Sequence, residues 1–398
     1  MTHLSILFIF LRLGCTSFGG PIAHLGYFRD EFVVRKQWLT EEDYANLIAL
    51  CQFIPGPASS QVGAAIGYQR AGYLGALSAW IGFTLPSAVL MVLFALSLGS
   101  LQDASLIDWF HGLKLVAVAV VAQAIWGMQK QLCSTLFTRL LAISAVAVLL
   151  VFPWQYMQLM VILGGVLAGL LVGQRDATSN ASLQPNAIQN GSSRSRFSTV
   201  LLLSLFVLGL IGIPAITANS SGLISLFDSL YRAGALVFGG GHVVLPLLFS
   251  EMVPSDLVTE SDFFLGYGAA QALPGPLFTF ATFLGAASAN EQATLAAGVA
   301  TIAIFIPGML LLFAALPHWQ TLSQHRLAKR SLIGVNAAVV GLLLAALVNP
   351  IIVTTIGSLS DVVIVALAIT ALIRFQVHPV WVIGGCLIAN TLVMVLFT

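Results

Sequence analysis

Long apolar runs follow one another along almost the whole chain, and they restrict it to folds that can sit in a lipid bilayer. A run of about 20 apolar residues is long enough to cross the hydrocarbon core as a helix. Only 8% of the 398 residues are charged, whereas about 25% is usual for a soluble domain. Too few charged side chains are present to cover a water-facing surface. The sequence therefore predicts an all-α polytopic membrane protein.

The apolar runs divide into thirteen segments, and we expect each to be helical. They lie near residues 4–26, 46–68, 73–99, 112–130, 137–153, 156–173, 198–216, 222–248, 263–288, 292–316, 331–348, 350–373 and 378–397. The polar, Asn- and Ser-rich stretch 174–197 predicts a flexible linker, which we place in the cytoplasm. It separates an N-terminal repeat (1–173) from residues 198–398, which hold one extra helix and a C-terminal repeat.

The two repeats are an internal duplication. An arginine, an FGG motif, a glutamate, a glutamine and a Pro-Gly-Pro motif recur in the same order, shifted by 219 or 220 residues. The matches are Arg12 with Arg232, residues 18–20 with 238–240, Glu31 with Glu251, Gln52 with Gln271, and residues 55–57 with 274–276. Apolar matches arise easily by chance, but an ordered series of charged, amide and Pro-Gly-Pro matches does not.

The extra helix between the repeats predicts that the second repeat is inverted, an architecture common among secondary transporters. With the linker inside, most loop Lys and Arg residues also lie inside, as the positive-inside rule requires. Two loops disagree if every segment spans: the basic loop with Arg29, Arg35 and Lys36, and its acidic counterpart at 251–262. Both agree if segments one, two, eight and nine are re-entrant hairpins, and we favour that arrangement over full spans.

Each Pro-Gly-Pro interrupts an apolar segment, because proline cannot continue a helix. Broken backbone is tolerated within a membrane only where protein buries it or where it lines a wet cavity. The helix that restarts after a break offers free N–H donors and partial positive charge, which suit an oxyanion. The alternative is a purely structural kink. The predicted binding residues are Arg12, Gly19, Gly20, Gln52, Pro55, Gly56, Pro57, Ser59, Ser60, Gln61, Arg232, Gly239, Gly240, Gln271, Pro274, Gly275, Pro276 and Thr279.

The two intramembrane arginines suit a doubly charged anion. A charge near the bilayer centre costs at least ~2.5 kcal/mol and usually has a partner, although either arginine could instead snorkel to the interface. The matched acids Glu31 and Glu251 are candidates for proton coupling, for pairing with the arginines, or for ordinary loop charges. His24 and His242 follow the glycine motifs and could carry a proton or cap a helix.

Other chemistry is not indicated by the sequence. A net charge of +1 gives no basic surface for nucleic acid. The four cysteines lack CxxC spacing, and the histidines lack a metal-binding pattern. No acid pair or nucleophile–base set appears, so we expect neither an enzyme, nor a cofactor, nor a metal site. Glycines at four-residue spacing (165, 169 and 173, and also 63 and 67) predict helix-packing faces.

Two stretches resemble the chromate ion transporter family in its long, two-domain form. They are FGGPIAHLGYFRDEFVVRKQWLTEEDY with LCQFIPGPASSQVGAAIGYQRAG, and FGGGHVVLPLL with QALPGPLFTFATFLG. The resemblance implies a bacterial plasma-membrane protein that exports chromate, driven by the proton gradient. It also implies functional roles for the matching positions, which are Arg12, residues 18–21, His24, Gln52, residues 55–57, Ser59, Ser60, Gln61 and Arg70.

The second Pro-Gly-Pro is flanked by Phe278 and Phe280 where the first has Ser59 and Gln61, so we expect unequal half-sites. Alternatives are a carrier of sulfate or another oxyanion, and an anion channel. We expect a proton antiporter, but residue types do not separate antiport from symport. The expected partners are the anion, protons and the lipid bilayer; a homodimer is left open.

Overall fold

The computed structural model describes residues 2–100, 104–152, 157–172, 193–217, 222–238, 244–289, 292–319, 321, 325–377 and 379–397. Every regular element in these ranges is helical, which confirms the predicted all-α class. The elements are α1 (His3–Thr16), α2 (Gly20–Arg29), η1 (Asp30–Arg35), α3 (Glu41–Phe53), α4 (Ala58–Ser100), α5 (Ala104–Leu132), α6 (Leu136–Val151), α7 (Met157–Val172), α8 (Ser193–Thr217), α9 (Leu223–Leu236), α10 (Val244–Met252), α11 (Glu260–Ala272), η3 (Leu277–Thr279), α12 (Phe280–Ala287), α13 (Ala293–Ala315), η4 (Leu316–His318), α15 (Arg326–Ala346), η5 (Leu347–Ile352), α16 (Val353–Thr355), α17 (Leu359–Ile373) and α18 (Pro379–Phe397).

The predicted segments correspond to these helices, with the breaks where the motifs fall. Segment one is α1 and α2 separated at Ser17–Gly19, and segment nine is α11 and α12 separated at the second Pro-Gly-Pro. By length and composition, five helical stretches in the described residues could cross a membrane: Ala58–Leu98, His111–Leu132, Arg196–Thr217, Ala293–His318 and Arg326–Thr355. Most of the predicted linker lies outside the described residues, but its end from Ser193 is already helical in α8.

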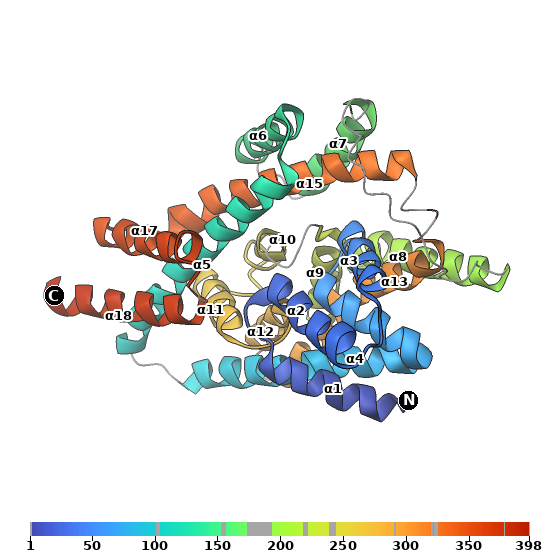
Figure 1. The fold of residues 1–398 in the computed structure, drawn as a ribbon. Coiled ribbons are helices and arrows are strands. Elements are labelled where there is room, and N and C mark those ends of the chain that lie inside the picture. Colours follow the sequence, from blue (N-terminus) through green and yellow to red (C-terminus); the bar gives the residue numbers. More distant parts are fainter. Residues whose placement is uncertain are drawn as a thin grey trace.

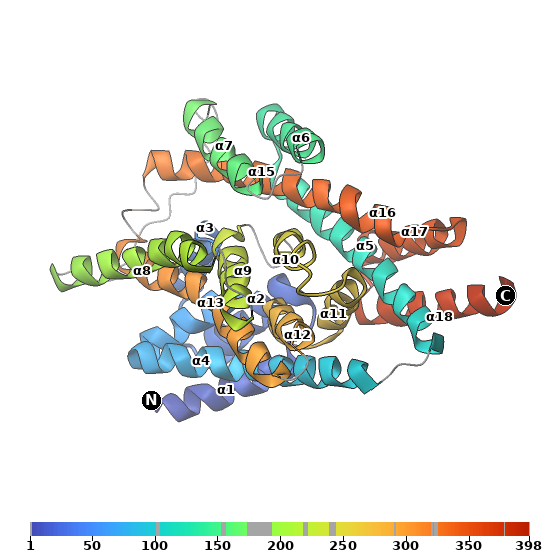
Figure 2. The ribbon, with the colours of Figure 1, turned by 180° about the vertical axis from the view of Figure 1, so that it is seen from behind.

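The helices form two bundles. The hairpin bundle contains α1–α4 and α8–α13 and occupies the lower right of Figure 1. The second bundle contains α5–α7 and α15–α18 and runs along the top and left of the same view; Figure 2 shows the same division from behind. Within the second bundle the repeats exchange helices: α5 packs against α17 and α18, whereas α15 packs against α6 and α7. The two halves are therefore interlocked.

The broken segments of the first repeat double back instead of spanning. The ring of Phe10 in α1 contacts Phe28 and Phe32, which lie towards the far end of α2 and in η1, so α1 and α2 form an antiparallel hairpin. The second hairpin is α3 and the start of α4. Its helix turns back at Ala71 and Gly72, where the backbone is not helical. There Arg70 donates a hydrogen bond to the carbonyl of Trp38, 2.6 Å away, which brings the exit of this hairpin beside its entrance.

The basic loop lies at the linker end of the molecule. The rings of Tyr68 and Tyr73, on either side of the α4 turn, pack around Phe313. The neighbouring Ala314 carbonyl accepts a hydrogen bond from Thr199, near the start of α8 and hence next to the linker. Since Arg70 ties the same turn to Trp38, the loop that contains residues 30–40 is on the linker side.

The acidic loop lies at the opposite end. Ser250, near the end of α10, donates a hydrogen bond to Gln158 over 3.3 Å. Gln158 begins α7, whose other end leads into the linker. The basic and acidic loops are therefore on opposite sides, as the re-entrant arrangement requires. Full spans would have reversed both.

Close glycine contacts hold the hairpins and bundles together. A Cβ on Gly67 would overlap the carbonyl of Gly75, so the two arms of the α4 turn touch backbone to backbone. Gly165 and Gly169 of α7 likewise meet the backbone of α15 at Gly334 and Arg330. Gly165, Gly169 and Gly67 thus lie on packing faces, as predicted, whereas Gly173 lies outside the described residues.

Cysteine accessibility tests the loop placement. In a background with exposed Cys15 replaced by serine, we expect Val34→Cys and Ser255→Cys to react with an impermeant maleimide from opposite sides of the membrane. Val34→Cys should react from the same side as a linker control, Ser182→Cys. Labelling of Val34→Cys from the side opposite the control would contradict the re-entrant fold.

Candidate functional site

The four breaks meet, and each repeat completes the broken backbone of the other. The N–H of Gly56 in the first Pro-Gly-Pro donates to the carbonyl of Val237, at the end of α9, over 2.8 Å. The N–H of Gly275 in the second donates to the carbonyl of Ser17, at the end of α1, over 2.9 Å. Ser17 and Val237 are themselves matched by the 220-residue shift. Such reciprocal contacts require a twofold relation between the repeats, and we call this region the crossing.

Only glycine fits at the centre of each Pro-Gly-Pro. Gly56 and Gly275 have φ of +126° and +95°, which side chains rarely adopt. A Cβ on Gly56 would lie 2.9 Å from the Cα of Gly308 in α13. A Cβ on Gly275 would lie 2.7 Å from the hydroxyl of Ser87 in α4. Each break is thus pressed against the helix that follows the hairpin of the opposite repeat.

The side chain of Gln61 stabilises the first break through hydrogen bonds. Its side-chain amide donates to the carbonyls of Pro55 and Gly308, each over 2.9 Å, and so links the first Pro-Gly-Pro to α13. The side chain is fully buried, and its Oε1 has no protein hydrogen-bond partner among the described residues. Gln61 therefore holds the break together while leaving one acceptor turned into the crossing.

Buried polar groups gather at the first half of the crossing. The Nδ1 of His24 lies 3.4 Å from the hydroxyl of Ser59, and the imidazole packs edge-on against Phe83 with centroids 5.2 Å apart. In the described part of the chain, five buried side-chain atoms of this region have no hydrogen-bond partner. They are Ser17 Oγ, His24 Nε2, Ser60 Oγ, Gln61 Oε1 and Thr84 Oγ1. Hydroxyls, an imidazole and the N-terminus of α4 can together donate to an oxyanion.

The second half of the crossing is apolar. Phe278 and Phe280 are buried, and the hydroxyl of Thr279 between them donates to the carbonyl of Pro276 over 2.8 Å. The matched glutamines are less central, since Gln52 is exposed and Gln271 is half-buried. Gly239, Gly240 and His242 lie outside the described residues.

The matched charges form ion pairs within each repeat. Arg12 Nη2 lies 2.6 Å from Glu31 Oε2, and Arg232 Nη2 lies 2.6 Å from Glu251 Oε2. Of the roles considered from the sequence, pairing with the arginines is the one the geometry shows. Each guanidinium contacts the carboxylate of its own repeat, so the two arginines belong to separate ion-pair clusters.

The surroundings of the two pairs differ. Glu31 also faces Arg35 and Lys36, at 3.7 Å and 3.6 Å, which gives a first-repeat cluster of Arg12, Glu31, Arg35 and Lys36. Arg232 also faces Asp228, at 3.4 Å, which gives a second-repeat cluster of Asp228, Arg232 and Glu251. The guanidinium-bearing side chain of Arg12 is 57% exposed, but that of Arg232 is only 15% exposed.

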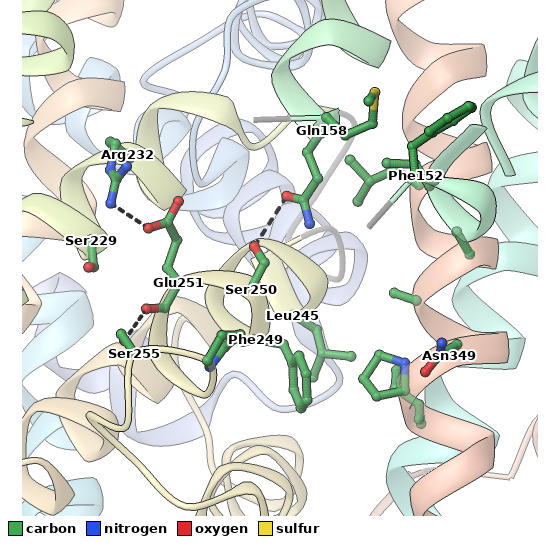
Figure 3. A pocket seen from close by; sticks show the side chains of 18 of the residues that line it. Phe152, Gln158, Ser229, Arg232, Leu245, Phe249, Ser250, Glu251, Ser255 and Asn349 are labelled. Carbon is green, nitrogen blue, oxygen red and sulfur yellow. Dashed lines mark hydrogen bonds and ion pairs between the residues drawn. The ribbon is translucent and has the colours of Figure 1, made fainter. Parts of the chain in front are cut away.

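A cavity of about 880 Å³ opens beside the second-repeat cluster. Arg232 and Glu251 line one wall, and Asn349 of η5 lies across from them (Figure 3). Gln158 and Ser250 meet at a third edge. The cavity thus lies between the hairpin bundle and the second bundle, at the end away from the linker. Arg232 is five residues before Val237, so α9 joins this wall of the cavity to the crossing.

Sequence reasoning found the motifs but missed several partners. Ser17 and Thr84 were not predicted, nor was Asp228. Asp228 could have been found, because it stands four residues before Arg232 and therefore on the same helix face. In the described residues no group of three or more His, Cys, Asp or Glu side chains could hold a metal ion.

The model of the family described as chromate transporter matches residues 4–170 and 224–391. The chain belongs to the chromate transporter family. The two matched ranges correspond to the two repeats, and the unmatched residues between them contain the linker and the whole of α8.

Several relatives match over most of their length. An uncharacterized transporter of Methanocaldococcus jannaschii is 28% identical over 86% of this chain and 83% of its own. The chromate transport protein of Pseudomonas aeruginosa is 25% identical, over 86% and 80%. That of Cupriavidus metallidurans is 27% identical, over 97% and 92%. No solved structure gave a significant match.

Alanine in place of Gly56 or Gly275 should weaken the contact between the repeats at the crossing. We expect Gly56→Ala and Gly275→Ala each to destabilise the protein by about 1–3 kcal/mol, because both strain and overlap oppose the new side chain. The matched control is Gly298→Ala in α13, where a Cβ would meet no atom within 4 Å. Thermal unfolding in detergent, followed by size-exclusion chromatography, measures the difference. Equal stability of all three variants would show that the crossing does not hold the fold together.

Proposed function

We propose that the protein is a secondary transporter that exports chromate, a tetrahedral dianion, across the bacterial plasma membrane. The observation that carries the proposal is the crossing. Two broken hairpins exchange backbone hydrogen bonds there, and buried donors beside them lack protein partners. The relatives from Pseudomonas aeruginosa and Cupriavidus metallidurans are both named chromate transport protein, which supports the choice of anion.

The chemistry of the crossing fits such a ligand. A dianion that leaves water must exchange its hydration shell for directed donors, or it loses many kcal/mol of solvation free energy. Ser60 and Ser17 offer hydroxyl donors, and the start of α4 offers free backbone N–H groups with partial positive charge. Since the second half is lined by Phe278 and Phe280, we propose that the first repeat makes most of the polar contacts.

Access is proposed to alternate between the two sides. The cavity beside Arg232 lies between the two bundles, at the end of the hairpin bundle away from the linker. Relative movement of the bundles would close this cavity and open its counterpart beside Arg12 at the linker end. No covalent step is needed, because the anion is moved and not reduced.

Coupling to the proton gradient is proposed to use Glu31, Glu251 and His24. Each of these titratable side chains contacts a residue of the proposed path. The two glutamates form ion pairs with Arg12 and Arg232, and His24 contacts the hydroxyl of Ser59. Protonation of a glutamate would release its arginine for the anion. Antiport remains our expectation for the direction of proton movement.

Radiolabelled chromate flux in inside-out vesicles tests the proposed function. We expect Ser60→Ala to lower the initial rate about tenfold, since one buried hydrogen bond is worth about 1–2 kcal/mol. Thr279→Ala is the matched control in the second repeat, and we expect it to change the rate less than twofold, because its hydroxyl already bonds Pro276. Competition by sulfate at equal concentration would identify a general oxyanion carrier, and flux that follows the membrane potential alone would identify a channel. Wild-type vesicles without chromate flux would refute the proposal.

The two arginines should respond differently to removal. Arg232→Ala leaves two carboxylates without their cation in a mostly buried site, so we expect it to cost about 3–5 kcal/mol of stability. Arg12→Ala should cost much less, because Glu31 keeps Arg35 and Lys36. We expect Arg232→Ala combined with Asp228→Asn and Glu251→Gln to recover stability but not flux. Flux and its response to an imposed pH gradient are measured on each variant. Unimpaired flux in Arg12→Ala and Arg232→Ala would remove both arginines from the path.

A further inference from the structure

The two ends of the proposed path carry opposite net charge, although they are built on matched ion pairs. Around Glu31 stand three cations, Arg12, Arg35 and Lys36, so the first-repeat cluster has a net charge of +2. Around Arg232 stand two carboxylates, so the second-repeat cluster has a net charge of −1. One carboxylate can balance only one cation, and two positive charges of the first-repeat cluster stay without a partner in it.

The difference comes from a few positions that the duplication did not keep alike. The 220-residue shift places Ser255 at the position of Arg35 and Asp256 at that of Lys36. It places Phe8 at the position of Asp228. The arginine and glutamate of each pair are the same in both repeats, and so are their 2.6 Å contacts. The charge difference is therefore local to the flanking residues.

The cations of the first-repeat cluster are open to an incoming anion. The side chains of Arg12 and Arg35 are mostly exposed, and Lys36 is less so because it lies over the ring of Trp38, 5.7 Å from its centroid. The other acids of the loop form no ion pair with these three cations in the described residues, although Asp30 and Glu42 align with serines in the second repeat. Arg29 is engaged by Glu41 and lies near Asp30, and the remaining acids of the loop, Glu42 and Asp43, begin α3. Glu41 and Asp43 have acidic counterparts in the other repeat, Glu260 and Asp262, so they do not distinguish the ends.

We infer that Arg35 and Lys36, together with Arg12, form a loading site for the tetrahedral dianion at the linker end of the path. The site gives that face the higher affinity for the anion. The inference rests on the proposed function and deepens it by naming what makes the two faces unequal. A dianion feels twice the potential that a monovalent ion feels, and clustered charge raises both its local concentration and its rate of association. The acidic cluster at the other end lacks this attraction and favours release.

Vesicles of both orientations give the test. The half-saturating chromate concentration is measured at each face, at about 10 mM and about 150 mM salt, because exposed charges are screened at the higher value. We expect the linker-side face of the wild type to saturate at a concentration about tenfold lower than the opposite face at low salt. Arg35→Ser with Lys36→Asp should remove most of that difference by acting on the linker-side face alone. The reciprocal exchange, Ser255→Arg with Asp256→Lys, should lower the half-saturating concentration at the opposite face.

Lys329→Asp is the control for general surface charge. Lys329 is an exposed cation at the start of α15, on the linker side but outside the cluster. Lys and Arg residues on that side also direct the orientation of a protein in the membrane. If Arg35 and Lys36 acted only on orientation or on surface potential, Lys329→Asp would have the same effect as Arg35→Ser with Lys36→Asp. That result would overturn the loading site, as would equal half-saturation at both faces of the wild type.

A binding readout separates this inference from the proposed function. Chromate absorbs light at the wavelengths at which tryptophan emits. The Lys36 ammonium lies 5.7 Å from the centroid of the Trp38 ring, so chromate bound at the cluster should quench the fluorescence of Trp38 in the purified protein. We expect salt-sensitive quenching that weakens at least fivefold in Arg35→Ser with Lys36→Asp. Quenching with this dependence but no flux would defeat the transporter and keep the binding site. Flux without the dependence would defeat the loading site alone.

Discussion

Two backbone hydrogen bonds, from Gly56 to Val237 and from Gly275 to Ser17, are the contacts on which the rest of the molecule depends. A broken helix inside a membrane leaves peptide groups that neither lipid nor its own turn can satisfy. Here the N–H of each Pro-Gly-Pro glycine donates to a carbonyl at the broken helix end of the other repeat. The consequence is that each repeat completes the break of the other, so the two repeats act as one structural unit. The exchange of α5 and α15 between the halves adds a second interlock of the same kind.

Symmetry of the backbone does not extend to the side chains. The crossing keeps Pro-Gly-Pro and an accepting carbonyl on both sides, yet the unpartnered hydroxyls described there belong to the first repeat, whereas Phe278 and Phe280 line the second half. The ion pairs repeat this pattern, with identical arginine–glutamate contacts inside flanks of opposite charge. In the proposed mechanism, a twofold scaffold would give the two conformations similar energies. The unequal side chains would then give the two faces different affinities for the anion.

The helices, the matched residues and the hairpins could be predicted from the sequence. The contacts between the breaks could not, for a physical reason. Apolar length gave the helices, the 220-residue shift gave the matched arginines and glutamates, and loop charge gave the re-entrant hairpins. What the pattern could not give is which break bonds to which, because that contact joins residues far apart in the chain and involves only backbone atoms. Ser17 and Thr84 were missed because an isolated hydroxyl in an apolar run has no periodic signature; its burial at the crossing is a tertiary property. Asp228 was missed although its four-residue spacing from Arg232 was visible.

The same hydrogen bonds limit how the proposed alternation can work. Hairpins from both repeats are joined through the crossing and through Gln61, whose amide holds α13 to the first break. Opening the path by parting the hairpins would expose those peptide groups and leave Gln61 without its acceptors. Sliding the hairpin bundle against the second bundle leaves them intact, and the cavity beside Arg232 lies along that boundary. Alternation by the second route would therefore keep the buried backbone hydrogen-bonded in both states, and the proposed binding groups of Ser60 and His24 would move with the hairpins that carry them.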